Sequence, residues 1–152
     1  MKQATFHILE SNQINGALDI MEELSCDLAA EQWRLGKSIF IACKNKDQAV
    51  KLDNALWDRK PYQFLPHNLI GEGPYYGAPI VLSWPGNNNN IPKELMICLQ
   101  HECVDFITNF NEVIDFVPYE NNLKQLARER YKIYRKIGFQ VITLELSNKY
   151  VV

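Results

Sequence analysis

Short apolar runs alternate with longer stretches of helical periodicity along most of this 152-residue chain. The runs are too uniformly apolar to have one face in water, which is typical of strands buried on both sides of a parallel sheet. We expect strands at Ala4–Leu9, Ser38–Cys43, Ile80–Trp84, Leu95–Leu99, Glu112–Val117 and Phe139–Leu146. Helices are expected at about 16–35, 46–56 and 118–138, the first with Asn15 as its N-cap, and a helical turn is expected at 105–110.

The order of these elements predicts the fold class. Strands and helices that alternate through short links favour one α/β domain over residues 1–146, followed by a loose tail at 147–152. We predict a three-layer, Rossmann-like architecture: a mostly parallel sheet with an antiparallel edge, helices on both faces and no phosphate-binding loop. Four prolines and three glycines in Lys60–Pro79 exclude a long helix there and predict an ordered loop.

The last predicted helix is amphipathic and basic. A helical wheel gathers its apolar side chains into one arc, formed by Leu123, Leu126, Ala127, Ile133, Tyr134 and Ile137. A stripe of cations lies beside this arc, formed by Lys124, Arg128, Lys132 and Arg135. Tyr131 falls on the seam between the two faces, where its ring could wall a groove for an anion. Arg130 lies within the apolar arc, so we expect it to snorkel or to form an ion pair.

Positive charge is concentrated on this helix. Residues 124–136 hold six of the 16 basic residues and one of the 18 acidic residues, so this segment carries +5 and the remainder of the chain −7. A positive stripe on an acidic body favours a compact acidic target, because the flanks would repel a long polyanion. Two alternatives stay open, namely direct binding of single-stranded nucleic acid by the stripe and a merely solvated helix face.

Known signatures of catalysis, nucleotide binding and metal binding are absent from the sequence. Residues 36–38, Gly-Lys-Ser, look like the end of a P-loop, but Glu31 stands where the first glycine is needed. The isolated histidines fit no catalytic constellation, and Cys26, Cys43 and Cys98 are expected to be buried free thiols. We therefore predict no enzymatic activity, cofactor or metal, and a small nucleotide-dependent enzyme is the least favoured class. No apolar stretch is long enough to span a membrane, so a cytoplasmic location is expected.

A second feature is a group of large apolar residues in an irregular segment, formed by Leu56, Trp57, Tyr62, Phe64, Leu65, Pro66 and Leu69. Loops normally lie at the surface, so part of this group is expected to form a hydrophobic patch for another protein. The alternative is that these side chains only cap one end of the sheet.

At both features, and over nearly its whole length, the chain resembles a known family, the chi subunit of bacterial DNA polymerase III. The likeness is carried by ATF at Ala4–Phe6, AAEQWRLGK at Ala29–Lys37, LDNALW at Leu52–Trp57, FLPHNL and GEGP within Phe64–Pro74, GAPI at Gly77–Ile80, and DFVPYENNLKQLARERYKIYR at Asp115–Arg135. It weakens at Asn87–Asn90 and after Val141.

The resemblance implies a non-catalytic adaptor in DNA replication that contacts DNA only indirectly. Chi proteins look like nucleotide-binding α/β domains without the phosphate loop. They pair with the psi subunit, which ties them to the clamp loader, and they bind the acidic C-terminal tail of single-stranded DNA-binding protein. Whether further partners, such as an accessory helicase, share the psi-facing patch stays open.

Two sets of site residues follow by position from the resemblance. The acidic tail would place its carboxylates on Lys124, Arg128, Lys132 and Arg135, with Arg128 at the terminal carboxylate. Val117 and Tyr131 would line the pocket for the last apolar side chain of the tail. The psi subunit would contact Trp57, Phe64, Pro66 and Leu69.

Overall fold

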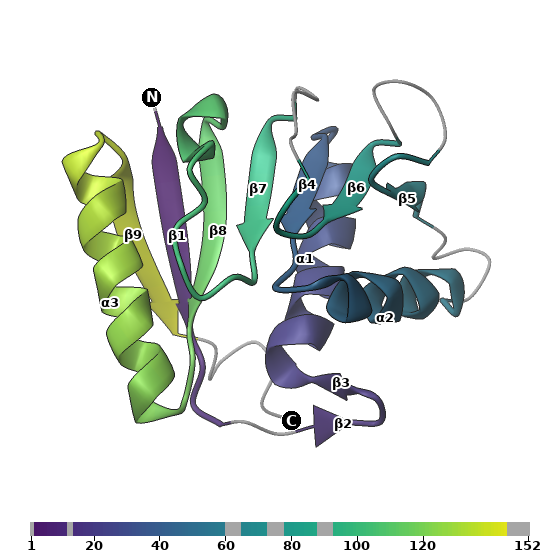
Figure 1. The fold of residues 1–152 in the computed structure, drawn as a ribbon, viewed down its shortest axis with the longest axis horizontal. Helices are drawn as coiled ribbons and strands as arrows, with labels where there is room; N and C mark the ends of the chain where they lie inside the picture. Colours follow the sequence, from purple (N-terminus) through teal and green to yellow (C-terminus); the bar gives the residue numbers. More distant parts are fainter. Residues whose placement is uncertain (1, 12–13, 60–64, 73–77, 88–92, 146–152) are drawn as a thin grey trace.

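The computed structural model describes residues 2–11, 14–59, 65–72, 78–87 and 93–145 (Figure 1). Its main sheet contains β1 (Gln3–Ile8), β4 (Ile39–Ala42), β5 (His67–Leu69), β6 (Ile80–Ser83), β7 (Leu95–Cys98), β8 (Glu112–Val117) and β9 (Gln140–Glu145). The helices are α1 (Ile20–Arg34), α2 (Lys46–Trp57) and α3 (Asn121–Lys136), with a 3-10 turn, η2, at Ile107–Asn109. A small hairpin of β2 (Ile14–Asn15) and β3 (Leu18–Asp19) precedes α1. The expected strands are confirmed, and β2, β3 and β5 are additional ones.

The sheet has the strand order β5-β6-β4-β7-β8-β1-β9, and every neighbouring pair is parallel. This confirms the predicted α/β class, but the predicted antiparallel edge is wrong for the strands that the structure describes. The edge strands β5 and β9 each follow a helix, α2 and α3 respectively. A chain that returns along a helix starts its next strand at the same end of the sheet as before, so these edge strands run parallel to their neighbours.

The start of the first helix also differs from the expectation. The helix begins at Ile20, because Gly16 has a φ of 65° and opens the tight turn of the β2–β3 hairpin. Asp19, not Asn15, is the N-cap: its side chain accepts a 2.8 Å hydrogen bond from the Glu22 backbone N–H. The Glu22 carboxylate in turn accepts a 3.0 Å bond from the Asp19 N–H, which completes a capping box.

Helices cover both faces of the sheet, as predicted. Alternate residues of the central strand β4 point to opposite sides, so Ile39 and Ile41 pack with the apolar residues of α1 and α2. Phe40 and Ala42 join the other core cluster, which includes α3 and the segment around η2. Figure 1 shows α3 at the β9 end of the sheet and α2 at the β5 end. The two helices therefore lie far apart on one scaffold.

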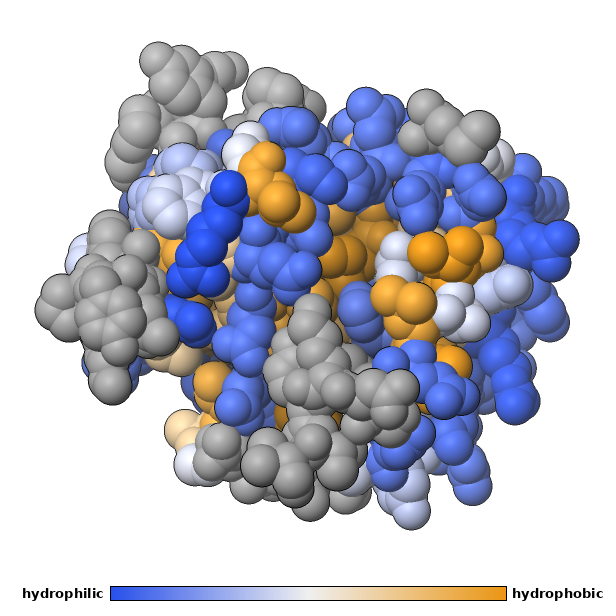
Figure 2. Space-filling view, turned by 180° about the vertical axis from the view of Figure 1, so that it is seen from behind, coloured by the Kyte–Doolittle hydropathy of each residue, from blue (hydrophilic) through white to orange (hydrophobic). Residues whose placement is uncertain are grey.

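The side of the molecule turned away in Figure 1 is mostly hydrophilic, with apolar groups in separate patches (Figure 2). On the edge strand β9, Ile142 and Leu144 are 36% and 47% exposed. They alternate with Val141, which packs on the α3 side of the sheet. Within the described residues, no helix combines the length and apolarity that a bilayer span requires.

Candidate protein-binding site

A groove of about 330 Å³ lies between α3 and the sheet. Its walls are Phe6 of β1, Val117 at the end of β8, and six residues of α3, namely Lys124, Ala127, Arg128, Tyr131, Lys132 and Arg135. All six residues that the sequence assigned to binding of an acidic tail therefore line one hollow. Sequence analysis missed the buried Phe6 and Ala127, because a strand residue and a small helix residue carry no charge signal.

The groove has an apolar floor. The Phe6 side chain is fully buried, and its ring centroid lies 5.6 Å from that of Tyr131. Tyr131 is half-buried, as expected for a residue on the seam of the helix. With Val117 and Ala127, these rings offer a contact surface that fits a single apolar side chain better than an extended polar one.

Cations form the rim of the groove. Lys132 lies 3.7 Å from Glu129 in an exposed ion pair, and such a pair is easily exchanged for another carboxylate. Lys124 Nζ lies 5.7 Å from the ring centroid of Tyr119, and the Arg135 guanidinium lies 6.0 Å from that of Tyr131. Within the described residues, the side chain of Arg128 makes no ion pair or hydrogen bond. Its guanidinium can thus bind an incoming carboxylate through two hydrogen bonds.

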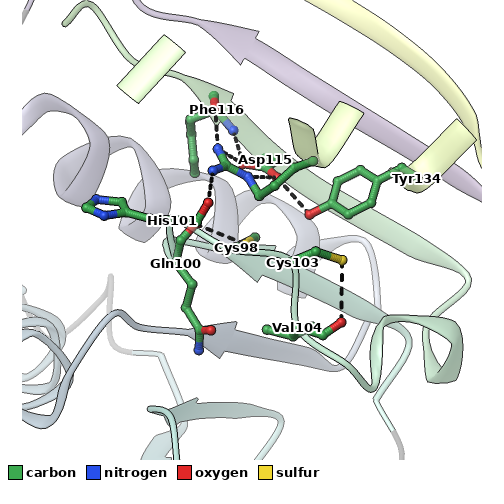
Figure 3. A network of polar contacts seen from close by, with 9 residues as sticks. Cys98, Gln100, His101, Cys103, Val104, Asp115, Phe116 and Tyr134 are labelled. Carbon is green, nitrogen blue, oxygen red and sulfur yellow. Dashed lines mark hydrogen bonds and ion pairs between the residues drawn. The ribbon is translucent and has the colours of Figure 1, made fainter. Parts of the chain in front are cut away.

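A buried polar network fixes α3 against the sheet. Figure 3 shows Asp115 of β8 and Tyr134 of α3 pointing toward one another. The Asp115 carboxylate accepts hydrogen bonds from Arg130 Nε at 2.8 Å, Arg130 Nη2 at 3.1 Å and the Tyr134 hydroxyl at 2.7 Å. Arg130 also donates to the carbonyls of His101 and Phe116, at 2.6 and 3.1 Å. The expectation that Arg130 would pair is confirmed.

This network also corrects the predicted apolar arc of the helix. The residues of α3 that are buried are Ala127, Arg130 and Tyr134, whereas Ile133 and Ile137 are 40% and 38% exposed. The pairing of Arg130 with Asp115 turns the helix so that the arginine points inward, and this moves the two isoleucines toward solvent. Burial raises the pKa of Tyr134 well above its usual value, so its hydroxyl keeps the proton that it donates to Asp115.

The second predicted set of residues lies at the opposite edge of the sheet. Trp57 ends α2 and is 58% exposed, whereas Pro66 and Leu69 are half-buried. Phe64 lies outside the described residues. The neighbouring Leu56 and Leu65 are fully buried. The segment therefore both caps the core and presents a large aromatic side chain at the surface.

The N-termini of α1 and α2 do not favour the binding of a nucleotide phosphate. In the β4–α2 connection the Gln48 side chain accepts a 2.8 Å hydrogen bond from the Lys44 N–H, and Asn45 caps the Gln48 N–H at 2.8 Å. Glu22 and Glu23 lie in the first turn of α1 and would repel a phosphate. The donors that hold phosphate in nucleotide-binding α/β proteins are therefore used internally or screened by carboxylates.

The described residues also offer no metal-binding cluster and no reactive thiol. No group of three or more His, Cys, Asp or Glu residues is placed to hold a metal ion within the described ranges. The four cysteines are free, and burial raises the pKa of Cys26 and Cys98 to about 12 and that of Cys103 to about 11. These thiols stay protonated near neutral pH and are poor nucleophiles.

Comparison with known proteins gives the family. The family model of the DNA polymerase III chi subunit, HolC, matches residues 1–142. The chain belongs to the DNA polymerase III chi subunit family. It is 50% identical over 143 residues to DNA polymerase III subunit chi of Escherichia coli, covering 94% of this chain and 97% of that protein. It is 44% identical to the subunit chi of Haemophilus influenzae, covering 93% of this chain and 96% of that protein.

Solved structures of other proteins share the fold. T4 UvsW matches with a TM-score of 0.63 at 10% identity, over 95% of this chain and 41% of that one. The C-terminal domain of the DEAD-box protein Dbp5 matches with a TM-score of 0.61 at 11% identity, over 97% and 91%. At such low identity the likeness shows the fold alone.

Proposed function

We propose that this chain is a non-catalytic accessory subunit of the bacterial replicative DNA polymerase III and joins two other proteins. One partner is the acidic C-terminal tail of single-stranded DNA-binding protein, which binds the groove along α3. The other is the psi subunit, through which the chain is tied to the clamp loader. The observation that carries the proposal is the groove itself, in which an apolar floor lies directly beneath four cations.

The groove suits the end of an acidic peptide. A terminal carboxylate bonds to Arg128 in the bidentate manner, and acidic side chains face Lys124, Lys132 and Arg135. The last apolar side chain enters between Val117 and Tyr131 and rests on Phe6. Each exposed ion pair contributes about 0.2–1 kcal/mol, so several pairs and one apolar anchor give a micromolar, salt-sensitive contact.

Calorimetric titration with a peptide that copies the acidic tail tests this assignment. Arg128→Ala is expected to weaken peptide binding about tenfold, because a charge-assisted bidentate contact is lost. Lys136→Ala is the matched control, since Lys136 is an exposed cation of the same helix outside the groove. Wild-type affinity should fall as salt is raised. Equal affinities of Arg128→Ala and wild type at low salt would contradict the assignment.

We assign the psi-facing surface to Trp57, Pro66 and Leu69, together with Phe64, which lies outside the described residues. Trp57 is its anchor, because an exposed tryptophan at the end of a rigid helix is the kind of side chain that dominates protein interfaces. Trp57→Ala should weaken psi binding by more than about 2 kcal/mol and leave tail binding unchanged. Val50→Ala is a control on the same helix, since Val50 is 37% exposed. Loss of both partners in Trp57→Ala would indicate a folding defect instead.

Direct binding of single-stranded nucleic acid is the second candidate function. It is favoured by Tyr119, which is 51% exposed next to Lys124 and could stack on a base. The net charge of −7 outside residues 124–136 opposes it. Titration with a naked oligonucleotide, side by side with the peptide, separates the two. Tighter binding of the oligonucleotide would favour this second candidate.

A further inference from the structure

A second groove lies on the face of the sheet opposite α3. It has a volume of about 250 Å³ and lies between the last turns of α1 and strands β8, β1 and β9. Thr5 and His7 of β1 line it, whereas Phe6 between them belongs to the core on the α3 side. The thickness of the sheet therefore separates this second groove from the groove along α3.

Large apolar side chains are exposed around the second groove. Leu35, the C-cap residue of α1, is 66% exposed, and Leu144 of β9 is 47% exposed; both line the groove. Ile142 lies two residues before Leu144 on the same face of this edge strand and is 36% exposed. Contact of these side chains with water is unfavourable, so this face favours an apolar occupant.

A segment of the chain itself follows the edge strand. It reads Leu-Ser-Asn-Lys-Tyr-Val-Val at 146–152, and it lies outside the described residues. In sequence, Leu146 continues the alternation of Ile142 and Leu144. The dipeptide Ser-Asn, which favours a turn, comes next, and the apolar residues 150–152 follow one lysine later. The segment therefore has a turn signal between two apolar parts.

The segment starts close enough to the second groove to reach it. β9 ends at Glu145, which lies beside Ile8 of β1, and Leu144 one residue earlier already lines the groove. Residues 149–152 would span about 13 Å when extended, at about 3.3 Å per residue. Two strand spacings, from β9 to β8, amount to about 10 Å. A chain that turns at 147–148 can therefore lay the residues after the turn across the groove.

The charges of the segment and of the second groove are complementary. The groove is lined by two carboxylates, Glu31 and Glu112, and by one ammonium group, Lys37, so with His7 neutral its lining carries a net charge of −1. The charged side chain of the segment is Lys149, which is positive. Because the segment is joined to β9, its effective concentration at the groove is on the order of millimolar, and a weak contact is enough for binding.

We propose that residues 146–152 fold back over this face and that the apolar residues 150–152 bind in the second groove, between Leu35 and Leu144. The bound segment covers the exposed apolar row of β9 and holds this edge strand against β1. Val141, on the opposite face of β9, packs in the core cluster that includes α3, so the segment supports the strand beneath α3. The expectation of a loose tail then does not hold. This proposal is independent of the two partners proposed above.

Methyl NMR of the full chain tests the proposal. Combining Tyr150→Ser with Val151→Ser removes most of the apolar group of the segment. We expect this variant to shift the methyl resonances around the second groove, namely those of Leu35, Ile142 and Leu144. Lys149→Arg is the control within the segment, because it keeps the charge and the apolar residues, and it should leave these resonances close to wild type. Resonances of all three residues that stay unchanged in the double variant would overturn the proposal, because this face would then be open in the full chain.

Thermal unfolding provides a second test. Leu35→Ser should lower the Tm of the wild-type chain by about 2–4 °C, the shift expected for the loss of one modest apolar contact in a chain of this size. In the variant that carries Tyr150→Ser and Val151→Ser, the same change should lower the Tm by much less, because the contact is already absent. Equal shifts in the two backgrounds would overturn the proposal. So would a concentration-dependent dimer that Leu144→Ser abolishes, because a second copy of the chain would then cover this face.

Discussion

Replacing Arg130 with methionine would leave Asp115 as an unpaired charge in the core. Asp115 is 0% exposed and Arg130 4%, so water cannot replace the guanidinium. The variant loses two hydrogen bonds to the carboxylate and two to backbone carbonyls. Removing one partner of a buried ion pair costs about 3–5 kcal/mol, a large part of the stability of a domain of this size. Arg130→Met should therefore still fold, with a much lower urea midpoint.

The destabilisation caused by Arg130→Met is expected to depend on pH. Without its cation, Asp115 keeps a folded-state pKa above its unfolded value, because burial raises the pKa and the guanidinium that lowers it is gone. A carboxyl group with a raised pKa in the folded state does not lower the free energy of unfolding below its unfolded-state pKa of about 4. The loss of stability grows as the pH rises from there through the folded-state pKa. The stability difference between Arg130→Met and wild type should therefore be larger at neutral pH than in acid.

Two comparisons make the test decisive. Arg128→Met changes an exposed arginine of the same helix to the same residue, and its stability should stay within about 0.5 kcal/mol of wild type. Adding Asp115→Asn to Arg130→Met removes the buried charge and should recover part of the loss. A cost below about 1 kcal/mol for Arg130→Met at neutral pH would refute the reasoning. So would a double variant that is less stable than the single one.

Two further predictions concern stability. Burial alone would raise the pKa of Glu22, but hydrogen bonds from Lys51, the Asp19 N–H and Gln48 lower it below its ordinary value. The stabilisation that the Glu22 carboxylate gives to the fold is therefore present above about pH 4.5 and is lost as the pH falls. Glu22→Gln should be less stable than wild type at neutral pH by about 1–3 kcal/mol, with a difference that shrinks in acid urea titrations. Ile133→Asn should change thermal stability by no more than about 0.5 kcal/mol, because Ile133 is exposed; a large loss would favour the apolar arc predicted from sequence.

Periodicity predicted most of the fold because burial repeats with the geometry of each element. The apolar runs around Phe40 and Met96 give strands that are buried on both faces, and local composition is enough to find them. The α3 helix shows where this reasoning stops. A helical wheel places Arg130 among apolar residues but does not indicate its partner, because Asp115 lies 15 positions earlier in the chain. Only the tertiary structure brings the two together and sets the rotation of the helix.

The sequence predicts the cations of the candidate groove but not the apolar residues of its floor. Lys124, Arg128, Lys132 and Arg135 repeat at helical spacing, so their alignment follows from the helix alone. Phe6 enters the groove because β1 lies between β8 and β9 in the sheet, which no local pattern indicates. The antiparallel edge was predicted wrongly for the same reason, since strand direction at an edge depends on the path of the connection and not on the strand itself.

The positions of the two surfaces explain how one small domain could serve two partners. The groove lies beside α3 at the β9 end of the sheet, and Trp57 lies at the β5 end. With six strand spacings of about 4.8 Å between these edges, the two sites are on the order of 30 Å apart. Sites so distant share no side chain, so the two proposed partners would not compete for the same residues. Coupling between the sites would have to pass through the paired strands of the sheet. The N-termini of α1 and α2 are capped by side chains of the chain itself, and a surface lies open at each end of the sheet. This arrangement suits the proposed role of connecting two proteins better than the binding of a nucleotide.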